Sequence, residues 1–326
     1  MEIKKRKLLT VILTWNDFEN TSKCLECCKK IKQDDITFLL VDNNSTDGSL
    51  EHLIKKFELE EIKNTNSQKQ LPKFLFIKNK ENLGCGLGHN TGYEFAINNN
   101  FKYVSRIDND MEFTDNFFEQ NLTILDQNIK IEALSPKILY DNLRHKIWWM
   151  GCVIGNNLKL QTNMRDYPYG IEDNKQLKGL KETDAIAGCA SIMRVDRLRE
   201  VGLSDKDFFY GPEDIEFSRR LYNGKDSLMV NLNSKIFHKV TQSFKPQHAF
   251  RRKYFEHKYR LLLINKIGSY GDKIIGYSIS IIKFFLYCVF SFKQKQRKKI
   301  LPVFKSLIDF FIFKRYGDFD RKNNNH

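Results

Sequence analysis

The sequence lacks the features of a secreted chain held together by disulfides. Its basic start, Met1–Lys7, leads directly into the apolar run Leu8–Leu13, which is too short for the core of a secretory signal and is typical of a first strand. The seven cysteines are odd in number and irregularly spaced, which argues against a disulfide framework. We therefore expect a reducing, cytoplasmic environment.

The cysteines also fail to complete a zinc site. Cys24, Cys27 and Cys28 have the spacing of half a site, but no second Cys or His pair with matching spacing follows them. Their positions favour thiols buried on an amphipathic helix instead.

Acidic residues are scarce only in the last part of the chain. The protein has 326 residues and a net charge of +14, and its 41% hydrophobic and 13% aromatic residues can form a sizeable core. Residues 1–240 contain 35 Lys and Arg against 35 Asp and Glu, whereas residues 241–326 contain 19 against 5. This contrast, with Pro246 near the change, predicts a domain over 1–240 and a basic helical tail over 241–326.

The tail pattern suggests contact with a membrane. Residues 274–292 are nearly all apolar over 19 residues, the length of a membrane span, but Lys283 lies in the middle. The basic run Lys293–Lys299 and the apolar segment Leu301–Phe313 are typical of helices that lie in the membrane interface. Three interpretations follow: a true span, interfacial attachment through 274–315, and packing against the body or a partner in a homo-oligomer.

The location of the charge also bears on the partners. The neutral body offers no evident basic face, so the sequence does not favour a nucleic-acid-binding protein. In the tail, positive charge alternates with apolar stretches, which favours an anionic membrane surface. We expect a cytoplasmic protein that is peripheral at the inner face of the cell membrane.

The first half of the sequence alternates strand-like and helix-like segments. This order predicts an α/β fold with a mainly parallel central sheet flanked by helices, in which ligands bind beyond the carboxyl ends of the strands. The predicted strands end in polar clusters, which should share one rim of the sheet. The strands are predicted at 8–14, 37–41, 74–78 and 103–107, and the helices at 20–31, 49–57 and 89–98.

The segment Asp108-Asn-Asp110 follows the last of these strands. Residues i and i+2 of a strand share a face, so both carboxylates could point at one divalent cation and at the ligand that it carries. Asp-Asn-Asp is also favourable turn chemistry, so the motif taken alone permits a plain turn.

A glycine-rich run, Asn82–Asn90, follows the third predicted strand and opens a helix. It does not fit a dinucleotide-binding fingerprint, because the third glycine would be His89 or Thr91, and it has no Lys-Ser/Thr pair of a phosphate-binding loop. It still offers flexible backbone near a phosphate or a sugar.

A further loop enters a helix near residue 212. Pro212 suits the first helical position, and Glu213 and Asp214 suit the positive end of the helix. Acidic residues at a helix start also occur for stability alone.

Together these segments resemble the inverting glycosyltransferases of family 2. The resemblance covers about residues 8–243 and is greatest to bacterial rhamnosyl- and hexosyltransferases that build surface polysaccharides. It implies a glycosyltransferase-A fold. The motifs that carry it, in chain order, are Thr14-Trp-Asn16, Val41-Asp42-Asn-Asn-Ser-Thr-Asp47-Gly48-Ser49, Asn82-Leu-Gly84, Gly88-His-Asn90-Thr-Gly92, Asp108-Asn-Asp110, Glu213-Asp214 and His238.

The resemblance also implies roles for individual residues. Asp214 matches the catalytic base, Asp110 matches the metal ligand, and His238 matches a histidine that binds the same metal in some members. Glu213, Trp149 and Gly188 are candidates for supporting the acceptor. The residues expected near the nucleoside, the donor sugar or the ribose are Thr14, Asn16, Asp42, Asn82, Gly84, Asn90 and Asp108.

The activity implied is transfer of a sugar from a UDP- or dTDP-sugar to a glycan or glycolipid acceptor, in synthesis of lipopolysaccharide, capsule or a related glycoconjugate. A hard cation, Mg²⁺ or Mn²⁺, would stabilise the charge on the leaving diphosphate. A separate carboxylate must take the proton of the acceptor hydroxyl on the opposite side, and Asp214 suits this because it comes from a distant segment. A lipid-linked acceptor would fit the membrane interpretation of the tail.

Two departures from the family pattern affect these expectations. Glu216 stands where many members carry Asp, which leaves the base in place but alters its surroundings. Asp108-Asn-Asp110 replaces an Asn-Asn-Asp motif of rhamnosyltransferase-like members, so rhamnose is not assigned as the donor sugar. Two other classes fit the same residues: a metal-dependent nucleotidyltransferase, which would release pyrophosphate, and a non-catalytic carbohydrate- or membrane-binding module.

Overall fold

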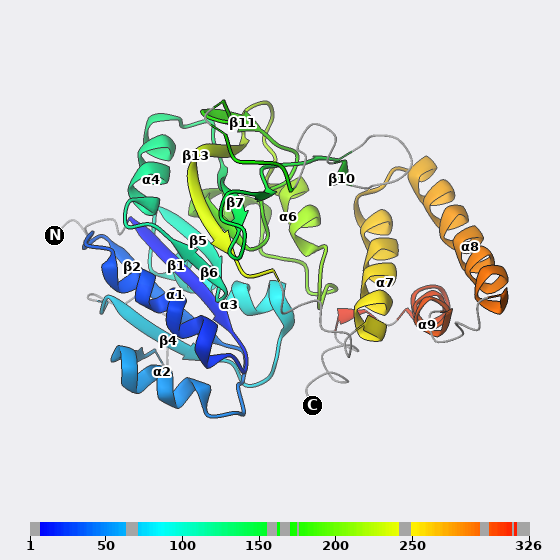
Figure 1. The fold of residues 1–326 in the computed structure, drawn as a ribbon, viewed down its shortest axis with the longest axis horizontal. Coiled ribbons are helices and arrows are strands. Elements are labelled where there is room, and N and C mark those ends of the chain that lie inside the picture. The colour runs from blue at the N-terminus through cyan, green and yellow to red at the C-terminus, as the bar shows by residue number, and fades with distance from the viewer. Residues whose placement is uncertain are drawn as a thin grey trace.

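The computed structural model describes residues 7–62, 71–154, 162–163, 170–174, 176–240, 249–293, 300–314 and 316–317. A central sheet with helices on both sides forms the body, and a group of helices from the end of the chain lies beside it (Figure 1). The predicted domain change near residues 241–247 lies outside the described residues.

The first half of the chain alternates strands and helices, which confirms the prediction from hydrophobic pattern. Strand β2 is buried along its whole length, as expected for a central strand covered on both faces. The elements are β1 (Leu8–Thr14), α1 (Phe18–Lys30), β2 (Ile36–Asp42), α2 (Ser49–Phe57), β3 (Glu60–Glu61), β4 (Phe74–Lys78), α3 (Gly84–Asn98) and β5 (Tyr103–Asp108).

The second half contributes shorter strands and the remaining helices. Helix α6 begins at Glu213, one residue later than the start at Pro212 predicted from the sequence, because Pro212 occupies the cap position. The elements up to residue 240 are β6 (Met111–Phe113), α4 (Phe117–Gln127), β7 (Ala133–Tyr140), β8 (Ile147–Trp149), β9 (Val153–Ile154), β10 (Thr162–Asn163), β11 (Leu180–Glu182), β12 (Ala190–Arg194), α5 (Val195–Val201), α6 (Glu213–Leu221) and β13 (Leu228–His238).

The main sheet has the strand order β11-β13-β7-β12-β5-β1-β2-β4-β3, with β6 paired to β13 and β8 paired to β7. Strands β5, β1, β2, β4 and β3 are parallel, which confirms the predicted parallel core. Strand β12 is antiparallel to both β5 and β7, so the other half of the sheet is mixed. The carboxyl ends of the parallel strands therefore meet at one edge.

Two hydrophobic clusters cover the two faces of the sheet. Alternate residues of β1 divide between them, because successive strand side chains point to opposite faces: Ile12 lies in the cluster under α1, α2 and α4, and Val11 in the cluster under α3, α5 and α6. Cys24 and Cys28 are buried on α1, and all seven cysteines are free. The prediction of buried thiols is thus confirmed for Cys24 and Cys28, whereas Cys27 is half-buried.

The glycine-rich run belongs to helix α3 rather than to a flexible loop. The helix begins at Gly84, five residues before the predicted start at His89. A Cβ at Gly88 would lie 2.6 Å from Leu13 Cδ1, and one at Gly92 would lie 2.4 Å from Val11 Cγ1. The glycines therefore let α3 pack closely on β1, a function that the sequence pattern alone did not distinguish from backbone flexibility.

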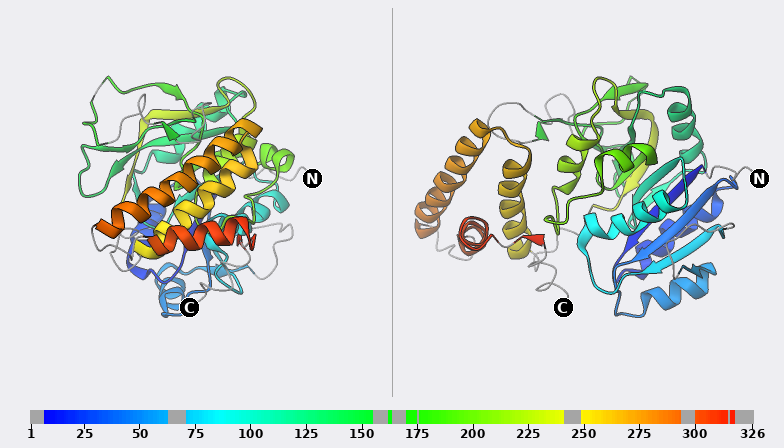
Figure 2. Two further views of the ribbon diagram at one scale, coloured as in Figure 1. Left: turned by 90° about the vertical axis from the view of Figure 1, so that its right-hand side faces the viewer. Right: turned by 180° about the vertical axis from the view of Figure 1, so that it is seen from behind.

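The described residues after 248 form the helices α7 (Ala249–Ile267), α8 (Tyr270–Lys293) and α9 (Ile300–Phe311). They pack on one another at the side of the body, with α8 on the outside (Figure 2). Tyr254 of α7 donates a hydrogen bond to Asp309 of α9 over 2.7 Å, and Lys258 donates to Tyr254 over 2.9 Å.

The helical group is fixed to the body through the segment before α6. Phe208 and Phe209 pack into the same cluster as Phe255 and Tyr259 of α7. Lys266 of α7 lies 2.8 Å from Asp205 Oδ2 and 2.6 Å from Asp207 Oδ2. Among the described residues, none of the helices combines the length and the apolar character required to cross a bilayer.

Candidate active site

Two cavities open at the edge of the sheet where the parallel strands end. The larger has a volume of about 520 Å³ and the smaller about 310 Å³, and we call them the large cavity and the small cavity. They share four lining residues, Cys85, Asp108, Tyr210 and His238, so they adjoin at this point. This edge is where ligands bind in open α/β sheets.

The sheet register brings distant residues to the junction. Asp108 is the last residue of β5 and lies opposite Leu13 of β1. Strand β13 pairs with β6 so that His238 lies opposite Met111. Asp110 comes immediately before β6, and its Oδ2 lies 3.3 Å from His238 Nε2.

The middle residue of the Asp108-Asn-Asp110 motif holds the turn against α1. Asn109 Nδ2 donates hydrogen bonds to Asp17 Oδ2 over 3.2 Å and to Thr21 Oγ1 over 3.0 Å. Asp17 also caps α1 by accepting from Asn20 N. The segment is thus a turn in which Asp108 and Asp110 both line the large cavity.

Asp110 and His238 fit a divalent cation. A carboxylate oxygen and an imidazole nitrogen already lie close together, and Trp148 packs edge-on against the His238 ring at 4.6 Å. His238 Nδ1 is buried and has no hydrogen-bond partner, while Nε2 faces the carboxylate. Oxygen and nitrogen donors of this kind suit first-row divalent metals. The donor atoms of this pair and their separation therefore fit a divalent metal ion.

A second group of metal-type ligands, Cys85, His89 and Asp108, lies within 4.8 Å of one another. His89 Nδ1 donates to the Cys85 carbonyl over 3.0 Å, which leaves a lone pair on the buried Nε2 facing Asp108 Oδ1 at 3.8 Å. Burial and Arg106 lower the pKa of His89 well below its usual value. However, Arg106 Nη2 donates to Cys85 Sγ over 3.0 Å, and this fixed positive charge opposes a cation there. This group therefore fits a cation less well than Asp110 and His238 do.

Asp214 faces the small cavity from the first turn of α6. Burial raises the pKa of Asp214 to about 6, the neighbouring Glu213 carboxylate adds to the rise, and Arg106 opposes it. A Cβ at Gly188 would lie 2.8 Å from Asp214 Oδ2, so only glycine leaves room for the carboxylate in this position. A carboxylate with a pKa in this range can accept a proton near neutral pH.

Glu213 forms a buried ion pair that fixes the start of α6. Its Oε1 lies 3.1 Å from Arg106 Nη2, and both side chains are 5% exposed. Removing one partner of such a pair leaves an uncompensated charge and costs roughly 3–5 kcal/mol. Glu213 therefore positions Asp214 relative to β5.

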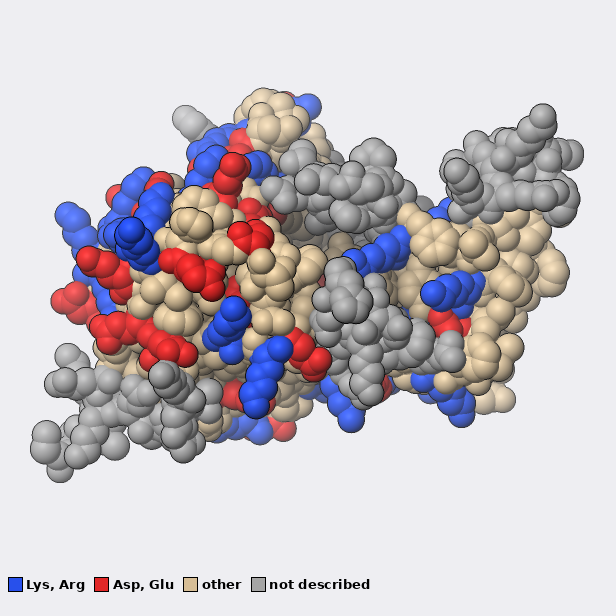
Figure 3. All heavy atoms as spheres, turned by 90° about the horizontal axis from the view of Figure 1, so that it is seen from below, with Lys and Arg blue, Asp and Glu red and all other residues tan. Residues whose placement is uncertain are grey.

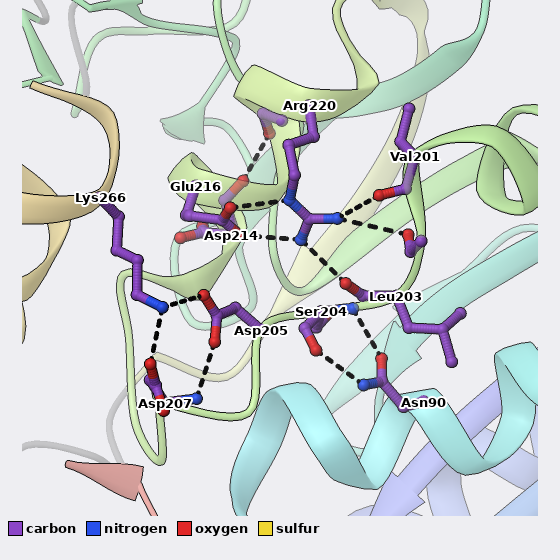
Figure 4. Close-up of polar contacts among 12 residues, drawn as sticks. Asn90, Val201, Leu203, Ser204, Asp205, Asp207, Asp214, Glu216, Arg220 and Lys266 are labelled. Atoms are coloured by element: carbon purple, nitrogen blue, oxygen red, sulfur yellow. Dashed lines mark hydrogen bonds and ion pairs between the residues drawn. The ribbon is translucent and has the colours of Figure 1, made fainter.

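Glu216 also has a structural partner. It binds Arg220 through two contacts, Nε to Oε1 at 2.7 Å and Nη2 to Oε2 at 2.8 Å, and Arg220 in turn donates to the carbonyls of Val201 and Leu203 (Figure 4). Glu216 thus holds Arg220, which connects α6 to the end of α5 and to the loop after it.

The predicted donor residues fall into two groups. Thr14, Asn82, Gly84 and Asp108 line the large cavity. Asn16, Asp42 and Asn90 are absent from its lining and are bonded to neighbouring loops instead. Asn90 exchanges two hydrogen bonds with the Ser204 backbone, as Figure 4 shows. Asp42 Oδ2 accepts from Ser45 N over 2.9 Å, and Asn16 Oδ1 accepts from Thr46 N over 2.8 Å.

The loop at the start of α3 explains why Asn82 and Gly84 reach the cavity. Asn82 Oδ1 accepts from Gly84 N over 2.9 Å and from Asn43 Nδ2 over 3.1 Å. Gly84 has φ of +80°, and a Cβ there would lie 2.3 Å from the Phe209 carbonyl oxygen. The loop is thus rigid and touches the segment that carries Tyr210.

The predicted acceptor residues come together in the small cavity. Trp149, Gly188 and Glu213 line it with Asp214. The two cavities are also lined by residues that were not predicted from the sequence, namely Arg106, Asn43, Tyr210, Arg251 and Phe255. Asn43 lies inside the recognised motif Val41–Ser49, and Arg106 lies two residues before Asp108. Arg251 and Phe255 come from α7 and carry no local signal in the sequence.

Comparison with known proteins identifies the architecture. The sequence profile described as Glycosyl transferase family 2 matches residues 10–202. A search of curated protein sequences finds no match to this chain. The fold is similar to that of S. aureus TarS 1-349, with a TM-score of 0.53 and 14% identity over 93% of this chain and 80% of that one.

A second similar structure is that of GalNAc-T7 with UDP, GalNAc and Mn²⁺, with a TM-score of 0.51 and 14% identity. The match covers 79% of this chain but only 51% of the GalNAc-T7 chain, about half its length. At this identity the similarity establishes the fold alone, which is the glycosyltransferase-A fold. Because the family profile covers more than half of the sequence, this chain belongs to glycosyl transferase family 2.

Proposed function

We propose that the protein is a metal-dependent inverting glycosyltransferase that moves a sugar from a nucleotide-sugar donor to a hydroxyl of a glycan or glycolipid acceptor. The observation that carries the proposal is the divided site. Asp110 borders only the large cavity and Asp214 only the small one, and the two cavities adjoin at Asp108 and His238. A base and a leaving-group site are thereby held on opposite sides of one junction.

The large cavity suits the donor. Its volume of about 520 Å³ is within the range of small-molecule sites. Trp15 and Tyr210 offer aromatic surface for a base or a sugar, and Arg251 of α7 supplies a positive charge for a diphosphate. The UDP in the GalNAc-T7 structure supports a UDP-sugar, and a dTDP-sugar has the same diphosphate chemistry.

The small cavity suits the acceptor. Trp148 and Trp149 line it, and such rings can cover the apolar face of a sugar while Asp214 faces the hydroxyl. The resemblance to transferases of bacterial surface polysaccharide synthesis supports a growing lipopolysaccharide or capsule glycan as the acceptor.

The reaction follows from this placement. Asp214 accepts the proton of the acceptor hydroxyl while that oxygen forms a bond to the anomeric carbon. The bond from this carbon to the diphosphate oxygen breaks, and the electron pair leaves with the nucleoside diphosphate. Attack from the side opposite the leaving group inverts the configuration. A divalent cation at Asp110 and His238 would stabilise the charge on the diphosphate.

The products of the reaction separate the three candidate classes. The purified protein is incubated with a panel of nucleotide sugars and either Mg²⁺ or Mn²⁺, and released nucleotides are measured. A nucleoside diphosphate is expected. Pyrophosphate release would replace the proposal by a nucleotidyltransferase, and binding with no turnover on any glycan acceptor would indicate a non-catalytic module.

Replacing the base should stop transfer without affecting the donor. We expect Asp214→Asn to lower the transfer rate by about 10²- to 10⁴-fold, because the amide cannot take the proton. Donor binding, measured by thermal stabilisation, should stay near that of the wild type. Asp226→Asn, the same change outside both cavities, serves as the control. Equal rates in the wild type and Asp214→Asn would refute the assignment.

The transfer rate should depend on pH through Asp214. Its pKa is raised to about 6, so the active carboxylate is lost as the pH falls through 6, and the rate should decline below that pH. Burial also raises the pKa of Asp108 to about 6, so the profile is recorded at increasing metal concentration. A decline of the rate at low pH that persists at saturating metal belongs to Asp214. A decline that saturating metal abolishes would belong to the metal site instead.

Removing a metal ligand should weaken metal-dependent donor binding. We expect Asp110→Ala to raise the metal concentration required for half-maximal donor binding by about 10- to 100-fold or more. His238→Ala should act in the same direction. Titration calorimetry with a nucleotide sugar and Mn²⁺ or Mg²⁺ measures the effect, with the exposed Asp115→Ala as control. Unchanged metal dependence in both variants would exclude this pair as the ligands.

Arg251 should contribute to diphosphate binding. A charge-assisted hydrogen bond contributes roughly 1.5–3 kcal/mol, so Arg251→Ala should weaken nucleoside diphosphate binding by about 10- to 100-fold. Binding of the nucleoside without phosphates should not change. Arg219→Ala removes an exposed arginine of α6 and is the matched control. A similar loss for nucleoside and nucleoside diphosphate would show that Arg251 acts only on the shape of the cavity.

A further inference from the structure

The outer side of the helical group exposes apolar side chains at high density. Eleven of the twenty large exposed hydrophobic residues of the described chain lie between Ile274 and Phe313. Phe285 and Val289 of α8 are 61% and 57% exposed, and Leu301 and Ile312, in and after α9, are 57% and 67% exposed. We call the solvent-facing side of α8, α9 and residues 312–313 the tail surface. An exposed apolar area of this kind marks an interaction site.

The helix period shows that this exposure belongs to one face of α8. Ile274, Ile282, Phe285 and Val289 lie on a common side, because residues three, four, seven or eight apart are neighbours on a helix. The opposite side is packed inside the protein: a Cβ at Gly276 would lie 2.7 Å from Ile264 Cδ1 of α7. The inner face of α8 thus packs on α7, whereas Ile274, Ile282, Phe285 and Val289 on its outer face are exposed among the described residues.

The exposed faces of α8 and α9 form one continuous surface. Phe284 of α8 stacks on Phe304 of α9 with ring centroids 5.6 Å apart and an angle of 22°. The two helices lie at the end of the molecule away from the sheet (Figure 2). In the part of this end that Figure 3 shows uncovered, most atoms are tan, with separate blue groups and a small red one.

The exposed charges among the described residues of the tail surface are lysines. Asp272, in the first turn of α8, is half-buried and accepts hydrogen bonds from Ser269. Asp309 of α9 is 2% exposed and accepts a hydrogen bond from Tyr254. Lys283, Lys305 and Lys314 are exposed. The sequence between the helices, 294–299, adds four further basic residues. An apolar surface with lysines and no exposed carboxylate complements anionic lipid headgroups above acyl chains.

We propose that the tail surface lies on an anionic lipid bilayer, with α8 and α9 in the plane of the interface. A second copy of the chain is a poorer partner, because its lysines would meet lysines of the same surface without carboxylates between them. The contact is independent of the chemistry proposed for the cavities. If both hold, α7 connects the membrane to the large cavity, because it carries Arg251 and packs on α8 and α9.

The test is sedimentation of the full chain with vesicles of phosphatidylcholine alone or with phosphatidylglycerol. We expect binding to the anionic vesicles, at least tenfold weaker binding to neutral ones, and a decrease with salt. Ile282→Asp with Phe285→Asp should weaken binding to anionic vesicles by at least about tenfold. Ile129→Asp is the matched control, since Ile129 is 82% exposed on the body and should leave binding unchanged.

Two readouts keep the result decisive. Thermal unfolding of the double variant near the wild-type temperature shows that the exposed changes leave the fold intact, and light scattering gives the mass in solution. A wild-type dimer that becomes a monomer in the double variant, without vesicle binding, would assign the surface to a second copy. Equal vesicle binding by the double variant and the wild type would also overturn the proposal.

Discussion

The buried ion pair between Arg106 and Glu213 connects the two halves of the site. Arg106 lies on β5 two residues before Asp108, and Glu213 lies directly before Asp214 on α6. Sheet and helix come from segments about a hundred residues apart, so this pair sets the separation of the metal-side and base-side carboxylates. Both side chains of the pair are buried, so moving one away from the other would leave an unpaired buried charge, which is costly. The pair therefore favours one position of α6 relative to β5.

The same guanidinium controls the electrostatics of the junction. It lies among Glu213, Asp108, Asp214 and the Cys85 thiol, and opposes the rise that burial causes in the pKa of both aspartates. It also helps to keep His89 neutral. A single buried cation thus lets several acidic groups share a small volume. Without it, burial and mutual repulsion would favour their protonated forms.

Much of the fold could be predicted from the sequence, because hydrophobic periodicity is local. Apart from the earlier start of α3 and the short strand β3, the strands and helices up to residue 108 lie close to their predicted ranges. Parallel pairing then places Thr14, Asn82 and Asp108 at one rim. The arrangement of the site was harder to predict from the sequence. The pairing of β13 with β6 brings His238 to Asp110, and this long-range register has no local signal. The resemblance to a family supplied that residue. Neither pattern nor resemblance indicated Arg251, because α7 begins at Ala249, beyond the residues 8–243 that carry the resemblance.

The contact between Gly188 and Asp214 limits how this site can change during evolution. Any side chain at position 188 would collide with the carboxylate, so a single substitution there would displace the base. If the small cavity holds the acceptor as proposed, new acceptor preferences would arise elsewhere on its wall, for example at Trp149 or Tyr210, which line the same cavity. In related chains we expect glycine to persist at this position while the aromatic wall diversifies with the acceptor.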